Sequence, residues 1–511
     1  MSKISKSFGD VTVHMLFSVI ISALGPFQYG FHLAELNAPQ DLIICGATSI
    51  TSGHVFANTF GFSNCINMTE SKFAFLSSVF VIGGLIGALS TGQGSTNYGR
   101  LKVMRLISLF FVVGSLLDTV SETVFTMFIG RFLIGLGAGA ATVITPLYIT
   151  EISPPDGRDL CGTITQTMIC LGILSTQILG YIFRFDSQWR FILLTGTGLG
   201  IVHAILLFFI PESPAWLLLN KSPQLAKQVL QSIRSADYPI HKEIALWNNQ
   251  NLTSAEEEPL ITSSISSPVM QNDSQNSITS KCNANIRAKK GVLSVLCDPL
   301  YRPAVIAVLG IMFAQQLSGI NSINLYSVSL LHGVIPTSSR VLAIVISAMN
   351  VTTTILCAPV IYYISRKSCL LFSTAGMGVM SFILALSLVL ELKLLAAFAV
   401  IFFVGFFATG LGPVPFIMAS ELVGIEAVSA TQSWCLAGNY TATFLVAQFF
   451  PLVNSWMNMK WGGTGWAFFG FAALAVINSV FIAYCVPETK GKSSPDEIWG
   501  RVKPDLNQQD A

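Results

Sequence analysis

The sequence predicts an all-α membrane protein with about twelve transmembrane helices in two pseudo-symmetric six-helix bundles. Of its 511 residues, 52% are hydrophobic and 11% are charged, and the mean hydropathy is +0.64. A soluble domain carries roughly 25% charged residues. Long apolar stretches recur along the whole chain, and short polar signatures in its first half return in its second half. These observations indicate a polytopic membrane protein built from a repeat.

The apolar stretches are each close to the ~20 residues that a helix needs to cross a bilayer core. They are continuous and do not alternate with polar residues, which excludes a membrane β-barrel. In chain order they lie near residues 13–36, 72–92, 103–122, 125–149, 160–183, 191–210, 303–331, 339–364, 369–391, 394–420, 430–454 and 463–486.

Basic residues gather in alternate loops. By the positive-inside rule such loops face the cytosol, so both termini and the central loop are predicted to be cytosolic. The net charge of only +2 gives no reason to expect a nucleic-acid partner. Outside the central loop, the basic residues in these alternate short loops or at the tail include Arg100, Lys102, Arg105, Arg158, Arg366, Lys367, Lys490 and Lys492.

Three signatures occur twice at a nearly constant offset. Arg100 and Arg366 follow the second and eighth spans, Glu151 and Glu421 end the fourth and tenth, and Glu212 and Glu488 follow the sixth and twelfth. The offsets are 266, 270 and 276 residues (366 − 100, 421 − 151 and 488 − 212). Such a parallel repeat is typical of transporters that rock two bundles about a midplane site.

The repeat divides the chain into four parts. Residues 1–214 and 301–490 are predicted to form the two bundles, 215–300 a cytosolic loop, and 491–511 a cytosolic tail. The loop has helical periodicity over Pro223 to Ile233 and then becomes rich in Ser, Asn and Gln, which favours disorder.

Within this loop, Glu256, Leu260 and Ile261 form an acidic dileucine pattern. If it binds a sorting adaptor, an endosomal or vacuolar membrane is favoured over the plasma membrane; an accidental match is the alternative.

The loop after the first span carries two features that depend on its compartment. Cys45 and Cys65 are candidates for a disulfide if this loop faces an oxidising environment. Asn67 begins the triplet Asn-Met-Thr, which is a glycosylation acceptor only if it is lumenal. The remaining cysteines are mostly scattered through the spans, as small hydrophobic side chains would be.

Uncharged amides lie inside the most apolar stretches. Such groups are costly in hydrocarbon unless they find partners, and since an amide both donates and accepts, several together suit a neutral ligand rich in hydroxyls. A glycine at Gly319 and the run Gly410 to Pro415 would break their spans and turn backbone groups toward a cavity. Phe416 follows the second break, either as an apolar platform or as ordinary packing. The amides are Gln166, Gln315, Gln316, Asn321, Asn350 and Asn439.

The first span carries an ionisable stripe. Gln28, His32 and Glu35 share one helical face and must point into the bundle. Arg131, at the start of the fourth span, is a candidate neighbour. Because histidine titrates near neutral pH, His32, Glu35 and Arg131 are candidates for proton coupling; a structural hydrogen-bond network is the alternative.

Seven sequence strings are distinctive when taken together. They are QYGFHLAELNAPQ (28–40), GRFLIGLGAG (130–139), PLYITEISP (146–154), PESP (211–214), QQLSGINS (315–322), GLGPVPF (410–416) and PETKGK (487–492). They resemble the sugar porter family of the major facilitator superfamily, and most closely a fungal branch linked to vacuolar protein sorting. The resemblance covers nearly the whole chain outside the central loop.

The resemblance implies roles for particular residues. The six amides above match the family's sugar-contacting amides. His32 stands where facilitators carry Asn and proton symporters carry Asp, and Arg131 matches the arginine that pairs with that position. The cytosolic gate of the family corresponds to Arg100, Glu151, Arg158, Glu212, Arg366, Glu421 and Glu488.

The gate also departs from the family pattern. Thr96 and Asn97 stand where an Asp-Arg pair is usual, Tyr362 replaces an acid, and Ala215 and Val428 replace basic residues. In the family these charges link the two bundles when the cavity opens outward. We therefore expect the resting equilibrium to favour inward-facing forms.

The leading hypothesis is a transporter that moves a monosaccharide or related polyol by alternating access, either facilitative or proton-coupled. The alternative is a sensor with a transporter fold that binds sugar without completing transport. No metal cluster, nucleophile constellation or phosphate loop is evident, so neither an enzyme nor a cofactor is expected. The membrane is either the plasma membrane or a vacuolar or endosomal one.

Overall fold

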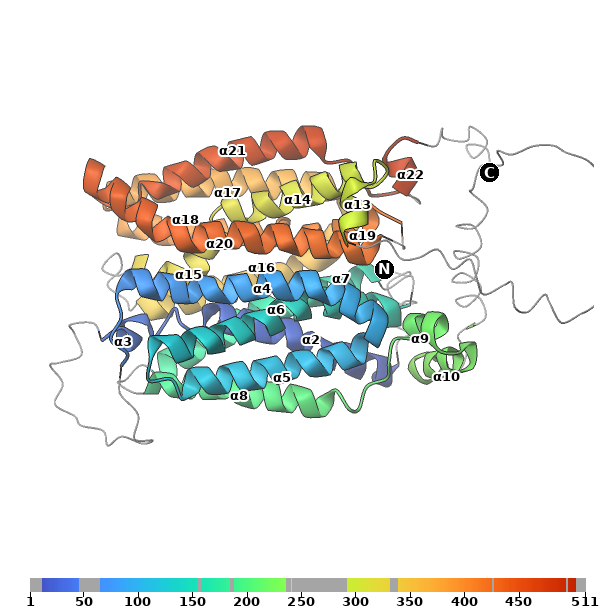
Figure 1. Ribbon diagram of the computed structural model, residues 1–511. Helices are drawn as coiled ribbons and strands as arrows, with labels where there is room; N and C mark the ends of the chain where they lie inside the picture. Colours follow the sequence, from blue (N-terminus) through green and yellow to red (C-terminus); the bar gives the residue numbers. More distant parts are fainter. Residues whose placement is uncertain are drawn as a thin grey trace, which may run out of the picture.

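The computed structural model describes residues 12–45, 65–154, 158–183, 188–235, 240, 292–330, 339–424, 427–492 and 495–501. Long helices dominate these segments and run roughly parallel to one another (Figure 1). Those of the first half are α2 (Val13–Ala34), α4 (Glu70–Tyr98), α5 (Arg100–Thr119), α6 (Val124–Ile152), α7 (Arg158–Ile182) and α8 (Trp189–Leu206).

The second half repeats this series with two of its spans broken. Its helices are α14 (Arg302–Leu317), α15 (Ile320–Leu330), α16 (Ser339–Tyr363), α17 (Arg366–Val389), α18 (Lys393–Thr409), α19 (Val414–Glu421), α20 (Val428–Trp461) and α21 (Ala467–Cys485). Short helices are α3 (Gln40–Ile43), α9 (Pro214–Asn220), α10 (Pro223–Ile233), α13 (Val292–Cys297) and α22 (Pro495–Ile498).

Hydroxyl side chains begin several of the long helices. Thr12, Thr69 and Thr123 each accept a hydrogen bond from the backbone N–H three residues ahead, and Ser365 does the same at α17. Such caps satisfy donors that the first turn of a helix leaves unpaired. The sequence therefore marks where these spans start.

Within the described residues, ten helices are long and apolar enough to cross a membrane, or eleven if the bent pair α14 and α15 counts as one span. The sequence predicted about twelve. The remaining one is α5, which has 20 residues but carries Arg100, Lys102, Arg105 and Asp118. Helix α5 packs against α6 and α8 within the first half. It is therefore missing from the apolar spans because of its charges and not because of its position.

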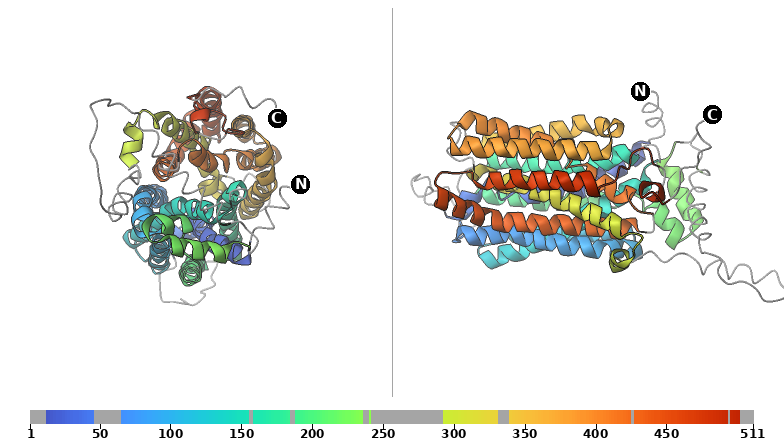
Figure 2. Two further views of the ribbon diagram at one scale, coloured as in Figure 1. Left: turned by 90° about the vertical axis from the view of Figure 1, so that its right-hand side faces the viewer. Right: turned by 90° about the horizontal axis from the view of Figure 1, so that it is seen from above.

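The same helix pairs form in both halves. In the first half α4 packs on α6, α5 on α6, and α5 on α8; in the second, α16 packs on α18, α17 on α18, and α17 on α21. The halves meet along α4 with α20 and along α7 with α16. Viewed along the helix axes, they form two adjacent groups of helices (Figure 2).

One end of the molecule carries α9, α10 and α22, beside the first and last described residues (Figure 1). The α10 region is fastened to the first half. Thr12 Oγ1 donates to the carbonyl of Ile233 at 2.8 Å, and Arg234 donates to the carbonyl of Ile152 at 2.7 Å. Helix α10 coincides with the periodicity predicted for Pro223 to Ile233.

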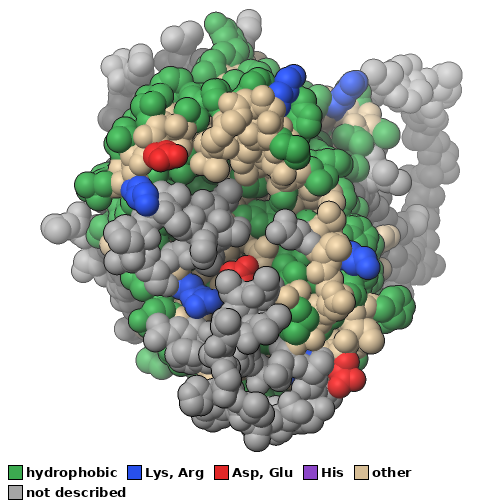
Figure 3. Space-filling view, turned by 90° about the vertical axis from the view of Figure 1, so that its left-hand side faces the viewer, with side chains coloured by type: hydrophobic (Ala, Val, Ile, Leu, Met, Phe, Trp, Pro, Cys, Tyr) green, Lys and Arg blue, Asp and Glu red, His purple; other side chains and the backbone are tan. Residues whose placement is uncertain are grey.

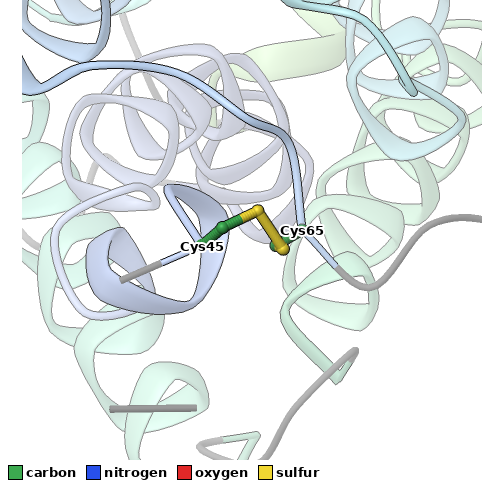
Figure 4. The surroundings of a disulfide bond; sticks show 2 residues. All are labelled: Cys45 and Cys65. Carbon is green, nitrogen blue, oxygen red and sulfur yellow. A yellow bond between two sulfur atoms is a disulfide. The ribbon is translucent and has the colours of Figure 1, made fainter. Parts of the chain in front are cut away.

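The opposite end carries α3 and few charged side chains on its visible face (Figure 3). Cys45 and Cys65 are joined there by a disulfide, with their Cα atoms 5.2 Å apart (Figure 4). Asn67 is exposed two residues later, and Thr69 of the same triplet caps α4. The structure thus leaves the acceptor asparagine at the surface.

Candidate functional site

Two broken spans build the candidate site. Gly319, with φ +94°, separates α14 from α15, which are bent by 43°; a side chain there would also meet the ring of Phe471. Residues 410–413 form a turn between α18 and α19. Both interruptions lie where the sequence predicted them, and the second frees backbone carbonyls inside the protein.

Gln315 is the centre of an amide network. Its Nε2 donates to the carbonyl of Leu411 at 2.5 Å, in the turn before α19. Its Oε1 accepts from Asn439 Nδ2 at 2.5 Å and from Gln316 Nε2 at 3.0 Å. Three segments, α14, α20 and the α18–α19 turn, therefore converge on one buried side chain.

The network continues onto α15. Asn321 Nδ2 donates to Gln316 Oε1 at 2.5 Å and to Thr443 Oγ1 at 3.1 Å. Asn324 Nδ2 lies 3.5 Å from Asn321 Oδ1, at the limit of a hydrogen bond. The amides thus satisfy one another in this state, and each retains donors and acceptors that a hydroxylated ligand could exchange.

Gln166 approaches from the other half. Its Nε2 donates weakly to Cys170 Sγ at 3.5 Å, and Cys170 lies 3.8 Å from Thr354 Oγ1 on α16. A Cβ placed on Gly412 would lie 3.4 Å from Gln166 Nε2, so this amide borders the turn that Gln315 contacts. Residues of both halves therefore reach the same turn.

The two other predicted contact residues lie on the second half. Asn350 is buried one turn before Thr354, and its Oδ1 has no hydrogen-bond partner among the described residues. Phe416 is partly buried at the start of α19, packed against the main hydrophobic core. The role of Phe416 as an apolar platform for a ligand stays a prediction.

The ionisable stripe of α2 lies inside the first half, between α2, α5, α6 and α8. Gln28 Nε2 lies 2.8 Å from His203 Nδ1 on α8. His32 Nδ1 lies 2.9 Å from Glu35 Oε2, and its ring stacks on Phe111 of α5. This pocket is separate from the amide network, which belongs mainly to the second half.

Arg131 pairs differently from what the family resemblance implies. Its guanidinium donates to the carboxylate of Glu35 and, at 3.0 Å, to the backbone carbonyl of His32, not to the His32 ring. It also lies over the ring of Phe80. The buried ion pair is therefore formed by Arg131 and Glu35. The His32 ring is linked to this pair by its hydrogen bond to the Glu35 carboxylate.

Sequence reasoning missed three residues of these two regions: Asp118 and His203 in the first half and Thr443 beside Asn321. Asp118 and His203 are buried within spans. Their signal was an ionisable residue in an apolar segment, which marks a functional candidate in membrane proteins. Thr443 had no such signal, because threonine is common in membrane helices.

The predicted gate residues form two matching networks, one in each half. Arg100 donates to Glu151 at 2.5 and 2.8 Å, and Arg366 donates to Glu421 at 3.3 Å. Each of these two ion pairs joins partners of the same half. Arg158 begins α7, and its side chain is outside the described part of the chain.

Glu212 and Glu488 cap corresponding helices. Glu212 accepts from the backbone N–H groups of Arg100 and Leu101, at the start of α5. Glu488 accepts from Ser365 Oγ and from the backbone N–H groups of Arg366 and Lys367, at the start of α17. A carboxylate at the N-terminus of a helix is stabilised by the positive end of the helix dipole.

The same contacts set the charge state of Glu488. Its partial burial acts to raise the pKa, but the hydrogen bond from Ser365 and those from the backbone outweigh it, so the pKa lies below its usual value. The carboxylate therefore stays ionised at neutral pH. The candidate adaptor residues Glu256, Leu260 and Ile261 lie outside the described residues.

A comparison with known families finds a match to the family described as "Sugar (and other) transporter" over residues 18–496. The chain is 32% identical over 500 residues to a probable metabolite transport protein of Saccharomyces cerevisiae, covering 96% of each chain. It is 31% identical to vacuolar protein sorting-associated protein 73 of the same yeast, covering 94% of this chain and 95% of the relative.

More distant similarity extends to animals and bacteria. Human solute carrier family 2, facilitated glucose transporter member 3, is 27% identical, with 95% of this chain and 92% of that one covered. Among solved structures, the proton:xylose symporter XylE bound to 6-bromo-6-deoxy-D-glucose aligns with a TM-score of 0.72 at 18% identity, covering 96% of this chain and 99% of XylE. At that identity the structural match supports the fold alone.

Proposed function

The chain belongs to the sugar transporter family of the major facilitator fold, and from this premise we propose that it carries a monosaccharide or related polyol across a membrane by alternating access. The amide network around Gln315 is the observation that carries the proposal. A sugar hydroxyl both donates and accepts, so it can replace each amide–amide bond without leaving a polar group unpaired. Sugar binding then biases the equilibrium between states through its different affinity for each.

Uptake into vesicles tests this proposal. Purified protein in proteoliposomes should take up labelled D-glucose or D-xylose faster than L-glucose, which has the same composition but the wrong stereochemistry. A wider panel of sugars and polyols then identifies the preferred one. Equal rates for all of them, matching protein-free vesicles, would contradict the proposal.

The same assay addresses the sensor hypothesis. A sensor would bind sugar, measured by a thermal shift of the purified protein, without any flux into vesicles. The relatives described above include a metabolite transport protein and a facilitated glucose transporter, so transport is favoured over sensing.

Proton coupling is the finer part of the proposal. The pocket of His32, Glu35 and Arg131 supports it, because a titratable ring is hydrogen-bonded to a buried ion pair. A facilitative carrier would equilibrate sugar, whereas a symporter would concentrate it in response to a pH gradient.

Replacing His32 by alanine is expected to leave net flux down a sugar gradient intact and to remove any dependence on a pH gradient. The reason is that the ring lies away from the amide network, whereas the proposed coupling requires it to bind and release the proton. Uptake with and without an imposed pH gradient measures both. Accumulation that survives in His32→Ala would eliminate this ring as the coupling site.

The resting state is proposed to be inward-facing. Asn37 Nδ2 donates to the carbonyl of Asn324 at 3.0 Å and so ties the halves together at the end that carries α3. At the other end, the Arg100–Glu151 and Arg366–Glu421 ion pairs each stay within one half. These contacts agree with the loss of family gate charges noted in the sequence.

A cysteine at Ala38, which is buried beside Asn37, is therefore expected to react slowly with a membrane-impermeant maleimide from the non-cytosolic side. Asn67→Cys, exposed at the same end, is the matched control, and the parent protein gives the background of native thiols. Labelling of Ala38→Cys as fast as that of Asn67→Cys would show that the outward cavity dominates.

The membrane and orientation are also proposals. Alternate basic loops support cytosolic termini, and the similarity to a vacuolar protein sorting-associated protein supports a vacuolar or endosomal membrane. Microscopy of a tagged protein, with protease protection of the tag, decides between this placement and the plasma membrane.

A further inference from the structure

Asp118 is a buried carboxyl group with no role so far. It lies near the end of α5, its side chain is fully buried, and neither carboxyl oxygen has a hydrogen-bond donor among the described residues. It packs tightly against α6, since a Cβ on Gly130 would come within 2.1 Å of Asp118 Oδ1. A buried carboxylate without donors is costly, so its presence in a membrane protein calls for a function.

Asp118 belongs to the pocket of His32. Phe111, Ser115 and Asp118 follow one face of α5 at intervals of four and three residues. Phe111 stacks on the His32 ring, and Ser115 Oγ and His32 Cε1 both flank Gly196 of α8. The carboxyl also lies within electrostatic range of Arg131 and Glu35.

The charges in this pocket do not balance if every acid is ionised. Arg131 is its permanent cation and is already paired with Glu35. Arg190 of α8 donates to the carbonyl of Thr119 at 2.7 Å, at the same end of α5, and interacts electrostatically with Glu122. Two carboxylates would then share one guanidinium, which leaves an uncompensated charge in a water-poor region.

The pocket also contains an acceptor for the extra proton. Glu35 is ionised by its pairing with Arg131, so His32 Nδ1 donates to it and Nε2 carries the lone pair. Nε2 is buried and has no partner among the described residues. The two unsatisfied groups, Asp118 and His32 Nε2, are complementary: one holds a proton that the other can accept.

We propose that Asp118 is a second protonation site of this pocket and exchanges one proton with Nε2 of His32. When the Asp118 O–H bond breaks, an N–H bond forms on His32, and the pocket changes from neutral acid and neutral imidazole to carboxylate and imidazolium. Its total charge is unchanged. Arg131 then lies between two carboxylates, while the imidazolium stays bonded to Glu35.

This exchange would link proton movement to the packing of α5, α6 and α2. The guanidinium of Arg131 is attracted toward whichever carboxylate lacks another partner, and α6, which carries it, also contacts the second half through α20. A single bridging water would carry the proton, since the unpartnered oxygens of Asp118 and Nε2 of His32 could hydrogen-bond to it. The inference rests on the proposed function and specifies its proton site.

Asp118→Asn tests it, because the amide has the size of the acid but cannot release a proton. In proteoliposomes the variant should exchange labelled sugar at close to the parent rate while losing both pH-gradient-driven accumulation and sugar-induced proton uptake. Glu391→Gln, an exposed acid just after α17, which is the counterpart of α5 in the second half, is the matched control and should behave as the parent. Accumulation by Asp118→Asn equal to that of the parent would overturn the inference.

A second measurement does not depend on transport. The infrared spectrum of the parent should contain the C=O band of a protonated, buried carboxyl group that is missing from Asp118→Asn and retained in Glu391→Gln. A parent without that band overturns the inference even if sugar uptake is confirmed. A parent that equilibrates sugar without ever concentrating it also overturns the inference, while leaving the proposed transport function in place.

Discussion

Replacing Gln315 by alanine is expected to lower sugar uptake about 100-fold, equivalent to about 2.7 kcal/mol. Gln315 accepts from both Asn439 and Gln316 and donates to the carbonyl of Leu411. Leaving buried polar groups unpaired costs about 1–3 kcal/mol each. In the proposed sugar site those groups also contact the sugar, so their misplacement should weaken binding as well as transport. Initial uptake rates and the sugar-induced thermal shift measure the two effects.

The control for this change is Gln224→Ala, which makes the same substitution on the exposed surface of α10. It should transport at the parent rate. If Gln315→Ala retained parent affinity and rate while folding normally, the amide network would not be the sugar site.

Replacing Arg131 by methionine is expected to destabilise the protein by about 3–5 kcal/mol, the usual cost of removing one partner of a buried ion pair. Arg131 and Glu35 are both essentially inaccessible to solvent, so the carboxylate would have only His32 to compensate its charge. Thermal unfolding in detergent, followed by the loss of monomeric protein, measures the change.

The double variant Arg131→Met with Glu35→Gln is expected to recover much of that stability, because it removes both charges together. Its uptake should no longer depend on a pH gradient. An Arg131→Met protein as stable as the parent would mean that the ion pair contributes nothing to the free energy of folding. If the added Glu35→Gln substitution did not restore stability, the loss in Arg131→Met would not come from the unpaired carboxylate.

The sequence was sufficient to locate the spans, their two breaks and the amides. Gly319 predicted a break because glycine in mid-span permits backbone conformations that other residues avoid, and the structure gives it φ +94°. The amides were selected because uncharged polar groups in hydrocarbon need partners. Local chemistry determines both, so no knowledge of the tertiary structure was required.

The partners of the ionisable groups could not be predicted in the same way. Gln28 contacts His203, which is 175 residues away in the sequence. Arg131 binds the Glu35 carboxylate and not the His32 ring. These choices depend on how α2, α6 and α8 are rotated against each other. Asp118 was visible as a lone acid, but near the end of a span it resembled the charges that border most membrane helices.

The two broken spans both belong to the second half, whereas α2 and α6, their counterparts in the first, run without interruption. The turn carbonyls that accept side-chain hydrogen bonds and most of the amides therefore lie in one bundle, and the group of His32, Glu35 and Arg131 lies in the other. Under the proposed function, sugar recognition and proton coupling would lie in separate halves of the chain. Recombination between relatives could exchange one property while preserving the other, provided that the contacts of α4 with α20 and of α7 with α16 remain compatible.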